Sequence, residues 1–292
     1  MPYALNLKSK IKNRMSSQLP STKIDRNPPP SNRQLLILLG LFVGFIIAVV
    51  WIVWSLVNNL IWLIPPSVEQ QLGALVVPAY EQQAKSSPAQ DTLNQLLDRL
   101  ETNLPEEQKQ ERNYQVLYIP QATVNALAIP GDRIIIYAGL LDKMTSENEL
   151  MMVMGHELGH FAHRDHLRGL GRQLFLQMAI ATIFGDVSWL QGTAAAVQAV
   201  SQAQFSQSQE TEADEFGLTL LQATYGQVAG ATDFFAQLNQ QKGINLAFLA
   251  THPNPGDRVI QLNRLIKARK YQVGVRSPLP KTLSGFTEFT GL

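Results

Sequence analysis

The chain has 292 residues, which is enough for one or two domains with a sizeable core. It contains no cysteine, and this excludes disulfide bonds, thiol catalysis and cysteine-ligated metal sites. The net charge of +1 conceals a basic arm, because residues 1–34 hold seven of the 24 Lys and Arg residues but one of the 23 acids. The other 17 basic and 22 acidic residues make the remainder of the chain acidic.

The arm and the segment that follows it predict a membrane anchor. Residues 1–34 are basic, polar and Pro-rich, and we expect them to be disordered. Residues 35–57 contain no charged residue, and about 20 such residues span a bilayer as a transmembrane helix. A cleaved signal peptide has a shorter apolar region and a small-residue cleavage site, which this segment lacks. Trp51, Trp54 and Trp62 lie toward one end, as in an interfacial aromatic belt.

The charge of the arm predicts the orientation of the anchor. The positive-inside rule places the N-terminus in the cytoplasm and the bulk of a single-pass protein on the non-cytoplasmic side. Basic arms also occur in nucleic-acid-binding proteins and in mitochondrial presequences. The position of this arm, directly before the apolar segment, favours the topology signal. We therefore expect contact with the lipid bilayer and no nucleic-acid partner.

After the anchor, the sequence predicts a mainly α-helical domain with a small β-sheet. Leucines at helical spacing predict a helix over residues 90–104. Residues 114–119 and 133–137 have the character of strands, and the turn Pro130-Gly131-Asp132 introduces the second. Further helices are expected over residues 146–172, 207–223, 227–241 and 256–269, followed by an irregular tail over 271–292.

Two segments between these helices have unusual composition. The apolar run 174–184 is too short to cross a bilayer and is followed by Asp186, so a buried or membrane-skimming helix is favoured over a second crossing. Residues 192–205 are rich in Ala, Gln and Ser, and we expect them to form a loosely packed, mobile segment. Such a segment is a candidate lid.

The sequence His156-Glu157-Leu158-Gly159-His160 is an HExxH motif. Positions i and i+4 of a helix share one face, so His156 and His160 can bind one zinc ion with Glu157 beside them. Zinc lowers the pKa of a bound water, and Glu157 is then the general base as that water attacks a peptide carbonyl. Ser146 and Glu149 form an S-x-x-E pattern that predicts the start of this helix.

A catalytic zinc site needs a third protein ligand and one open position. The candidate is Glu210, because Glu210, Asp214 and Gly217 share a face of the helix predicted over 207–223. Asp214 can accept the second ring N–H of a zinc-binding histidine and fix its tautomer. Gly217 lets the two helices approach closely, whereas Glu212 points away from this face.

His166 is the alternative third ligand, because it stands where an HExxHxxGxxH pattern places its last histidine. That pattern needs a glycine that turns the chain, and His163 occupies this position. If the helix continues without a break, His166 lies about 15 Å along it from His156. Glu210 is therefore favoured, and His163 and His166 are expected to be exposed or to support the site.

His252, in Thr251-His252-Pro253-Asn254-Pro255, is the only histidine outside the cluster over 156–166. It is either a turn residue before the helix over 256–269 or part of the active site. In the active site it has two possible roles, which are to stabilise the transition-state oxyanion or to occupy the open zinc position in a latent form.

In chain order, several short motifs resemble the M48 family of zinc metallopeptidases. The specific pair is HELGH at 156–160 with ETEAD at 210–214. The weaker matches are Val124-Asn125-Ala126, Pro130-Gly131, Gly139-Leu140-Leu141, Glu147-x-Glu149-Leu150 and THPNPGDRV at 251–259. The single anchor looks most like the BepA-like quality-control branch of that family, because the other branches carry more membrane helices.

The resemblance implies a gluzincin (zincin-like) metallopeptidase domain over residues 65–270. It implies one Zn²⁺ per chain, bound by His156, His160 and Glu210, in a metalloendopeptidase that cleaves unfolded or membrane-associated polypeptides. It also implies that the substrate is held as an added strand along Arg133, Ile134, Ile135, Ile136 and Tyr137. An edge strand offers main-chain hydrogen bonds to an extended peptide of almost any sequence.

Three other interpretations stay open. In the first, the chain is a latent or inactive zinc-binding, chaperone-like membrane module. In the second it is a hydrolase that uses His166, and in the third it is a structural membrane protein with coincidental motifs. The sequence does not name a substrate, a membrane or an oligomeric state.

Overall fold

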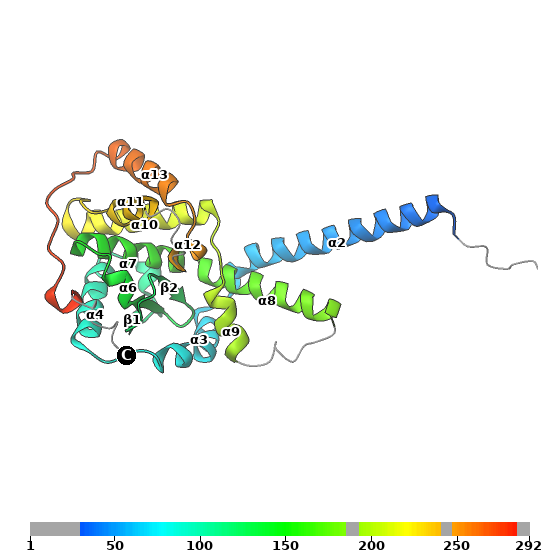
Figure 1. The fold of residues 1–292 in the computed structure, drawn as a ribbon, viewed down its shortest axis with the longest axis horizontal. Helices are drawn as coiled ribbons and strands as arrows, with labels where there is room; N and C mark the ends of the chain where they lie inside the picture. Colours follow the sequence, from blue (N-terminus) through cyan, green and yellow to red (C-terminus); the bar gives the residue numbers. More distant parts are fainter. Residues whose placement is uncertain (1–29, 185–192, 241–246, 285–292) are drawn as a thin grey trace, which may run out of the picture. The chain divides into compact units, whose positions relative to one another are not determined.

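The computed structural model describes residues 30–184, 193–240 and 247–284 (Figure 1). The chain divides into two compact units, Met1–Ile52 and Val53–Leu292. Among the described residues, one helix is long and apolar enough to cross a membrane. This is α2 (Asn32–Leu60), which continues into the short helix η1 (Ile61–Leu63) with a mean hydropathy of 3.1. The apolar helix predicted over 35–57 is therefore confirmed, whereas most of the predicted disordered arm lies outside the described residues.

The second unit is mainly helical, with one small sheet, as predicted. The helix predicted over 90–104 corresponds to α4, and those predicted over 207–223 and 256–269 correspond to α10 and α13. The helix predicted over 227–241 is shorter and begins only at Asp233. The helices are α3 (Pro66–Glu81), α4 (Pro88–Glu101), α5 (Glu106–Lys109), α6 (Ala138–Leu141), α7 (Glu147–Ala162), α8 (Asp165–Phe184), α9 (Thr193–Ser201), α10 (Gln207–Tyr225), α11 (Asp233–Gln240), α12 (Ala247–Thr251) and α13 (Pro255–Ala268), with the 3₁₀ helix η3 (Lys281–Leu283) in the otherwise irregular tail.

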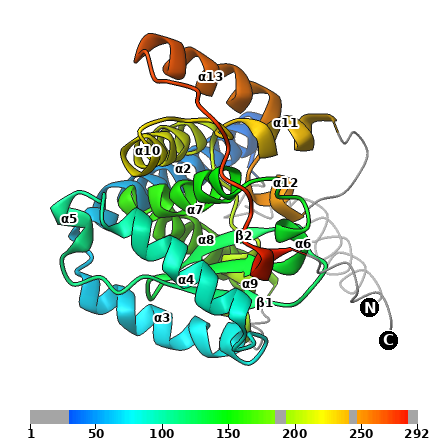
Figure 2. The ribbon, with the colours of Figure 1, turned by 90° about the vertical axis from the view of Figure 1, so that its left-hand side faces the viewer.

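The core is built around α7 and the sheet. The twelve consecutive residues of α7 from Leu150 to Phe161 are all buried, because the helix is covered on all sides. Helix α10 lies along one side of α7, and α4 and the sheet lie on the other (Figure 2). A helix that is apolar on every face has to be buried in this way. The HExxH motif therefore lies in the interior of the unit and not on its surface.

The sheet has three strands, β1 (Gln115–Ile119), β2 (Ala126–Ile129) and β3 (Arg133–Tyr137). Strand β3 is central, parallel to β1 and antiparallel to β2. The two predicted strands are confirmed, but the sequence analysis missed β2. The expectation that Arg133, Ile134, Ile135, Ile136 and Tyr137 receive a substrate strand is wrong, because both sides of β3 are already paired.

The two outer edges of the sheet differ in how their main-chain groups are used. The outward edge of β1 is closed by side chains of α4, since Asn94 Oδ1 accepts from Val116 N at 2.9 Å and Gln90 bonds Val116 O and Tyr118 N. The amide of Lys85 bonds Tyr118 O at 3.2 Å. The other edge belongs to β2. Its register turns the main-chain groups of Ala126 and Ala128 away from β3.

The helix predicted over 146–172 is broken after the HExxH motif. Helix α7 ends at Ala162, and Arg164 has a positive φ of 57° before α8 begins at Asp165. The break is held by long-range contacts, because Arg164 Nη1 donates to the carbonyl oxygens of Ile61 at 2.9 Å and of Ile64 at 2.5 Å. Local periodicity carries no trace of these contacts, which explains the wrong prediction.

The Ala-rich segment over 192–205 is better packed than expected. Most of it forms α9, and Ala199 and Val200 are buried against α3 and α8. Small side chains allow this close contact. The run over 174–184 forms the second half of α8, and the described part of the chain contains no second membrane-crossing candidate.

Candidate metal centre

Helix α7 places the two motif histidines on one face. Ser146 caps the helix, since its side chain accepts from the amide of Glu149 at 3.3 Å, as the S-x-x-E pattern predicted. The Nε2 atoms of His156 and His160 are 3.1 Å apart, and both side chains are fully buried. One turn of helix therefore presents two imidazole nitrogens at the spacing that a single metal ion requires.

Helix α10 brings the carboxylate of Glu210 to the same point because the two helices nearly touch. A Cβ atom on Gly159 would lie 2.7 Å from Ala213 Cα, and one on Gly217 would lie 2.8 Å from His156 N. Real Cβ atoms essentially never come this close to another heavy atom. The close approach predicted for Gly217 is therefore confirmed, and Glu212 is exposed on the opposite face.

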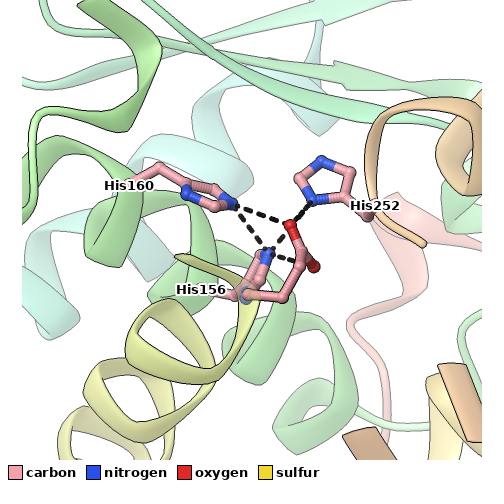
Figure 3. A group of neighbouring side chains, drawn as sticks. His156, His160 and His252 are labelled. Carbon is pink, nitrogen blue, oxygen red and sulfur yellow. Dashed lines mark hydrogen bonds and ion pairs between the residues drawn. The ribbon is translucent and has the colours of Figure 1, made fainter. Parts of the chain in front are cut away.

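Four side chains meet at this crossing, and His252 is one of them. One donor atom from each of His156, His160, Glu210 and His252 lies within 4.8 Å of the other three, and all four residues are buried. His252 Nδ1 is 3.2 Å from His156 Nε2 and 3.0 Å from Glu210 Oε1. Glu210 Oε1 is 3.6 Å from His160 Nε2. Figure 3 shows the three imidazole rings directed at a common point.

These donors fit a zinc ion in both chemistry and spacing. Zinc binds imidazole nitrogens and carboxylate oxygens at about 2.0–2.2 Å, so neighbouring ligands of a tetrahedral ion are about 3.3 Å apart. Five of the distances between donor atoms here lie between 3.0 and 3.6 Å, and all donor atoms lie within 4.8 Å of one another. Three nitrogens and one carboxylate are also the donor set that suits zinc rather than the oxygen-only sites of Ca²⁺ or Mg²⁺.

Carboxylates on the far side of the two imidazole rings, at Nδ1, fix both motif histidines. Asp214 Oδ1 lies 2.9 Å from His156 Nδ1, in the arrangement expected from the sequence. Asp165 Oδ2 lies 3.1 Å from His160 Nδ1, and this partner was missed. Gln209 Nε2 donates to the other oxygen of Asp165 at 2.6 Å. A histidine whose Nδ1–H is held by a carboxylate presents Nε2 as the metal-binding atom.

The electrostatics keep two of the donors in the form that a metal requires. Burial lowers the pKa of His156 to about 4, and the charge of Arg258 adds to this effect. Burial would raise the pKa of Glu210, but the charges of Arg258 and His252 hold it well below its usual range. For His160, burial favours the neutral form, yet hydrogen bonds to Asp165 and Glu210 raise its pKa to about 10. A metal ion at Nε2 would require the neutral form of His160, with its Nδ1–H held by Asp165.

Arg258 is the main site residue that the sequence analysis missed. It extends from the first turn of α13, and Nη2 and Nε donate to the two carboxylate oxygens of Asp214 at 2.6 and 2.8 Å. Its Nη1 is 2.7 Å from Glu210 Oε2. The guanidinium thus joins α13 to Glu210 and Asp214 of α10, and Arg258 is 2% exposed. The available signal was its place in the motif over 251–259, six residues after His252.

Aromatic rings cover the centre on the side of His252. Phe248 stacks on the His252 ring at 4.4 Å, and Phe205 stacks on the His160 ring at 3.8 Å. Glu157 is fully buried, and neither of its oxygens has a hydrogen-bond partner among the described residues. His252 Nε2 is 3.7 Å from Glu157 Oε1. In this conformation the centre is closed to solvent.

His163 and His166 stand outside the cluster. His166 Nε2 lies 2.7 Å from Glu69 Oε1, and Glu69 also pairs with Arg112 at 2.7 Å. His163 is partly exposed, and its Nδ1 lies 2.9 Å from the carbonyl oxygen of Gly159. The structure thus brings Glu210 and not His166 to the motif. The reason differs from the one expected. An unbroken helix was expected to carry His166 too far along its axis, whereas the helix in fact breaks and turns His166 toward α3.

Comparison with known proteins gives a consistent result. The profile of peptidase family M48 matches residues 88–266. The metalloprotease LoiP of Escherichia coli (strain K12) is 31% identical over 196 residues, which cover 65% of this chain and 73% of LoiP. The mitochondrial metalloendopeptidase OMA1 of Arabidopsis thaliana is 30% identical over 144 residues, which cover 49% of this chain and 29% of OMA1. The human metalloendopeptidase OMA1 is 26% identical over 172 residues, with 53% and 32% covered. The chain thus spans about a third of the length of these OMA1 relatives.

Proposed function

The chain belongs to peptidase family M48, and from that premise we propose that it is a membrane-anchored zinc metalloendopeptidase of the quality-control type. The observation that carries the proposal is the buried set of His156, His160 and Glu210 with Glu157 beside it. His156, His160 and Glu210 would hold one Zn²⁺, and Asp214 and Asp165 would orient the two histidines.

In the proposed reaction each residue has a distinct task. The zinc ion, when bound, makes its water acidic enough to ionise near neutral pH and polarises the scissile carbonyl. Glu157 takes a proton from the attacking water and delivers it to the leaving amine. Its carboxylate suits this task because no other side chain of the described residues holds it in a hydrogen bond. Arg258 keeps Asp214 and Glu210 ionised and in place.

His252 gives the described conformation the character of a resting state. Its Nδ1 stands at hydrogen-bond distance from His156 Nε2 and Glu210 Oε1, where the open position of a catalytic zinc is required. Phe248 and Phe205 close the same side. We propose that the segment that carries Phe248 and His252 withdraws from the centre when a substrate binds. This account joins the protease with one of the three interpretations that the sequence left open, the latent module, because the chain is latent at rest and a protease when open.

Replacing His252 tests this account. His252→Ala is expected to raise zinc-dependent cleavage of unfolded casein by the detergent-solubilised full chain about tenfold, the change that corresponds to about 1.4 kcal/mol of lost stabilisation of the closed state. A chelator is expected to abolish the cleavage. His163→Ala, which removes a histidine outside the cluster, is the matched control and should change nothing.

The opposite result would be equally informative. If His252→Ala lowers turnover while the zinc content stays at one per chain, His252 stabilises the transition state and does not block the site. If neither variant nor wild type cleaves casein with zinc bound, the chain is a zinc-binding membrane module and the proposed enzymatic function is wrong.

The substrate is proposed to bind as a strand beside β2 and not beside β3. On the β2 edge the main-chain groups of Ala126 and Ala128 face away from the sheet, and the amide of Ala126 donates to Asn125 Oδ1 at 3.0 Å. A substrate strand would replace that local bond, whereas the side chains of α4 close the β1 edge. Main-chain pairing recognises an extended peptide with little regard to its sequence. This suits unfolded segments of membrane or exported proteins. Because β2 is buried in the closed conformation, substrate binding requires the same opening as zinc access.

We also propose that the catalytic unit lies on the non-cytoplasmic side, with α2 as the anchor. In sealed vesicles, residues 65–292 are expected to resist protease added from the cytoplasmic face. Replacing the seven Lys and Arg residues of the arm by Gln should mix the two orientations, because the apolar segment itself carries no charge bias. Complete digestion of residues 65–292 from the cytoplasmic face would contradict the orientation.

A further inference from the structure

An apolar cavity lies where the chain leaves the anchor. Its volume is about 320 Å³, and every lining residue is apolar or glycine. Leu56 and Ile64 contribute from the end of α2 and from the segment that follows it, Leu72 from α3, and Leu170 and Leu174 from α8. Leu56 is 48% exposed, so the cavity is open at this end. It lies outside the candidate metal centre.

Three arginines line the neighbouring face of α8. Arg164, Arg168 and Arg172 are four residues apart, so they follow one another along one side of the helix and the turn before it. The guanidinium carbons of Arg164 and Arg168 lie 5.8 and 5.5 Å from the ring centre of Trp62, and that of Arg172 lies 5.3 Å from the ring of Trp54. We call these five residues the arginine–tryptophan surface.

The positive charge of this surface is poorly compensated. Asp165 pairs with Arg168 at 3.1 Å, but the same carboxylate also holds His160 and Gln209. Arg172 donates to the neutral amide oxygen of Gln209 at 3.2 Å. Burial lowers the pKa of Arg172; the charge of Asp165 opposes this effect, and the charge of Arg168 adds to it. A partly desolvated cluster of like charges gains stability when an anion binds to it.

The position of the surface indicates what this anion is. Trp54 lies near the end of the apolar segment 35–57 and Trp62 lies just beyond it. This is the part of an anchor where tryptophans and arginines meet lipid headgroups. Leu63, Val68 and Leu75 add exposed apolar side chains over the same short stretch, at 75%, 39% and 51% exposure. A cationic surface beside an apolar cavity is complementary to one molecule with a phosphate at one end and an acyl chain at the other.

We propose that the arginine–tryptophan surface and the adjoining cavity bind one anionic phospholipid of the bilayer that anchors the chain. The phosphate lies against Arg168 and Arg172 between the two tryptophans, and one acyl chain enters the cavity past Leu56. Helix α8 carries both this surface and Asp165, the partner of His160. The lipid therefore joins the membrane to α8, the helix that holds His160 through Asp165.

The test uses the full chain in phosphatidylcholine nanodiscs that contain a minority of lipid with brominated acyl chains. Bromine quenches tryptophan fluorescence on contact, and the brominated lipid is phosphatidylglycerol in one arm and phosphatidylcholine in the other. We expect stronger quenching by phosphatidylglycerol, because the surface enriches it. Arg168→Gln with Arg172→Gln should lower this enrichment by about fivefold for each arginine removed. Arg264→Gln with Lys267→Gln, on exposed positions of α13, is the charge-matched control and should retain it.

Further arms separate the parts of the proposal. Leu56→Asn keeps the arginines but makes the mouth of the cavity polar, and it is expected to reduce the enrichment. Equal quenching by the two lipids would overturn the proposal, as would full enrichment in the arginine variant. Inorganic phosphate should compete no better than sodium chloride at the same ionic strength. Stronger competition would show a site for free phosphate and would also overturn it.

Discussion

Glu157→Gln is expected to reduce peptide cleavage by about 10²–10⁴-fold while the chain still binds one zinc ion. The side chain is not among the four donors that meet at the crossing of α7 and α10, so the ligands survive the change. Glutamine has nearly the same shape as glutamate but cannot accept the proton of the attacking water. The fall should appear in kcat, with the zinc content measured by mass spectrometry in the same sample.

This measurement is best made in two backgrounds. In the wild type, His252 stands close to the centre and can mask the effect, so the comparison is repeated in the His252→Ala variant. Glu212→Gln is the matched control, because Glu212 lies on the exposed face of α10. Full turnover in Glu157→Gln would refute the assignment of the general base. Loss of zinc in that variant would mean that Glu157 is itself a ligand.

Arg258→Met is expected to cause the largest loss of stability of any single change at the site. The side chain is buried and holds Asp214 at 2.6 Å and Glu210 at 2.7 Å. Removing one partner from a buried ion pair typically costs about 3–5 kcal/mol, because the remaining charge is left without compensation. For a chain of this size the unfolding midpoint should fall by about 10 °C.

Two further variants show whether charge is the cause. Arg258→Met combined with Asp214→Asn should be less destabilised than the sum of the two single variants, because the second change removes a carboxylate that the first left unpaired. Arg264→Met, on the exposed face of the same helix, should have a midpoint close to that of the wild type. Zinc should restore more stability to Arg258→Met than to the wild type, since the ion also neutralises Glu210. A midpoint unchanged in Arg258→Met would contradict the role assigned to the guanidinium.

The sequence alone determined the features that depend on local spacing. The long apolar helix follows from an uncharged run that is long enough to span a bilayer, and α2 covers this run. Histidines four residues apart share a helix face in any helix, which is why His156 and His160 were recognisable before the fold was known. Glu210, Asp214 and Gly217 share a face for the same reason, and Gly217 lies at the close crossing of α7 and α10.

The tertiary structure decided everything that joins distant segments. Local periodicity could not show that Arg164 ends α7 by donating to the carbonyl groups of Ile61 and Ile64, and so the helix over 146–172 was predicted without a break. Hydrophobic alternation likewise identifies a strand but not its neighbours. The place of β3 at the centre of the sheet, and of β2 at its edge, appeared only in the pairing.

The candidate centre shows the same division most clearly. Its two histidines on α7 are four residues apart, but His252 and Arg258 reach them from 96 and 102 residues farther along the chain. A sequence can indicate that a histidine between prolines is presented by a stiff loop, yet it contains no local signal for where that loop lies. The packing of α13 against α10 and α11, and of Phe248 from α12 in the core, decides that. Burial of apolar surface and of paired charges acts on groups that only the folded chain brings together.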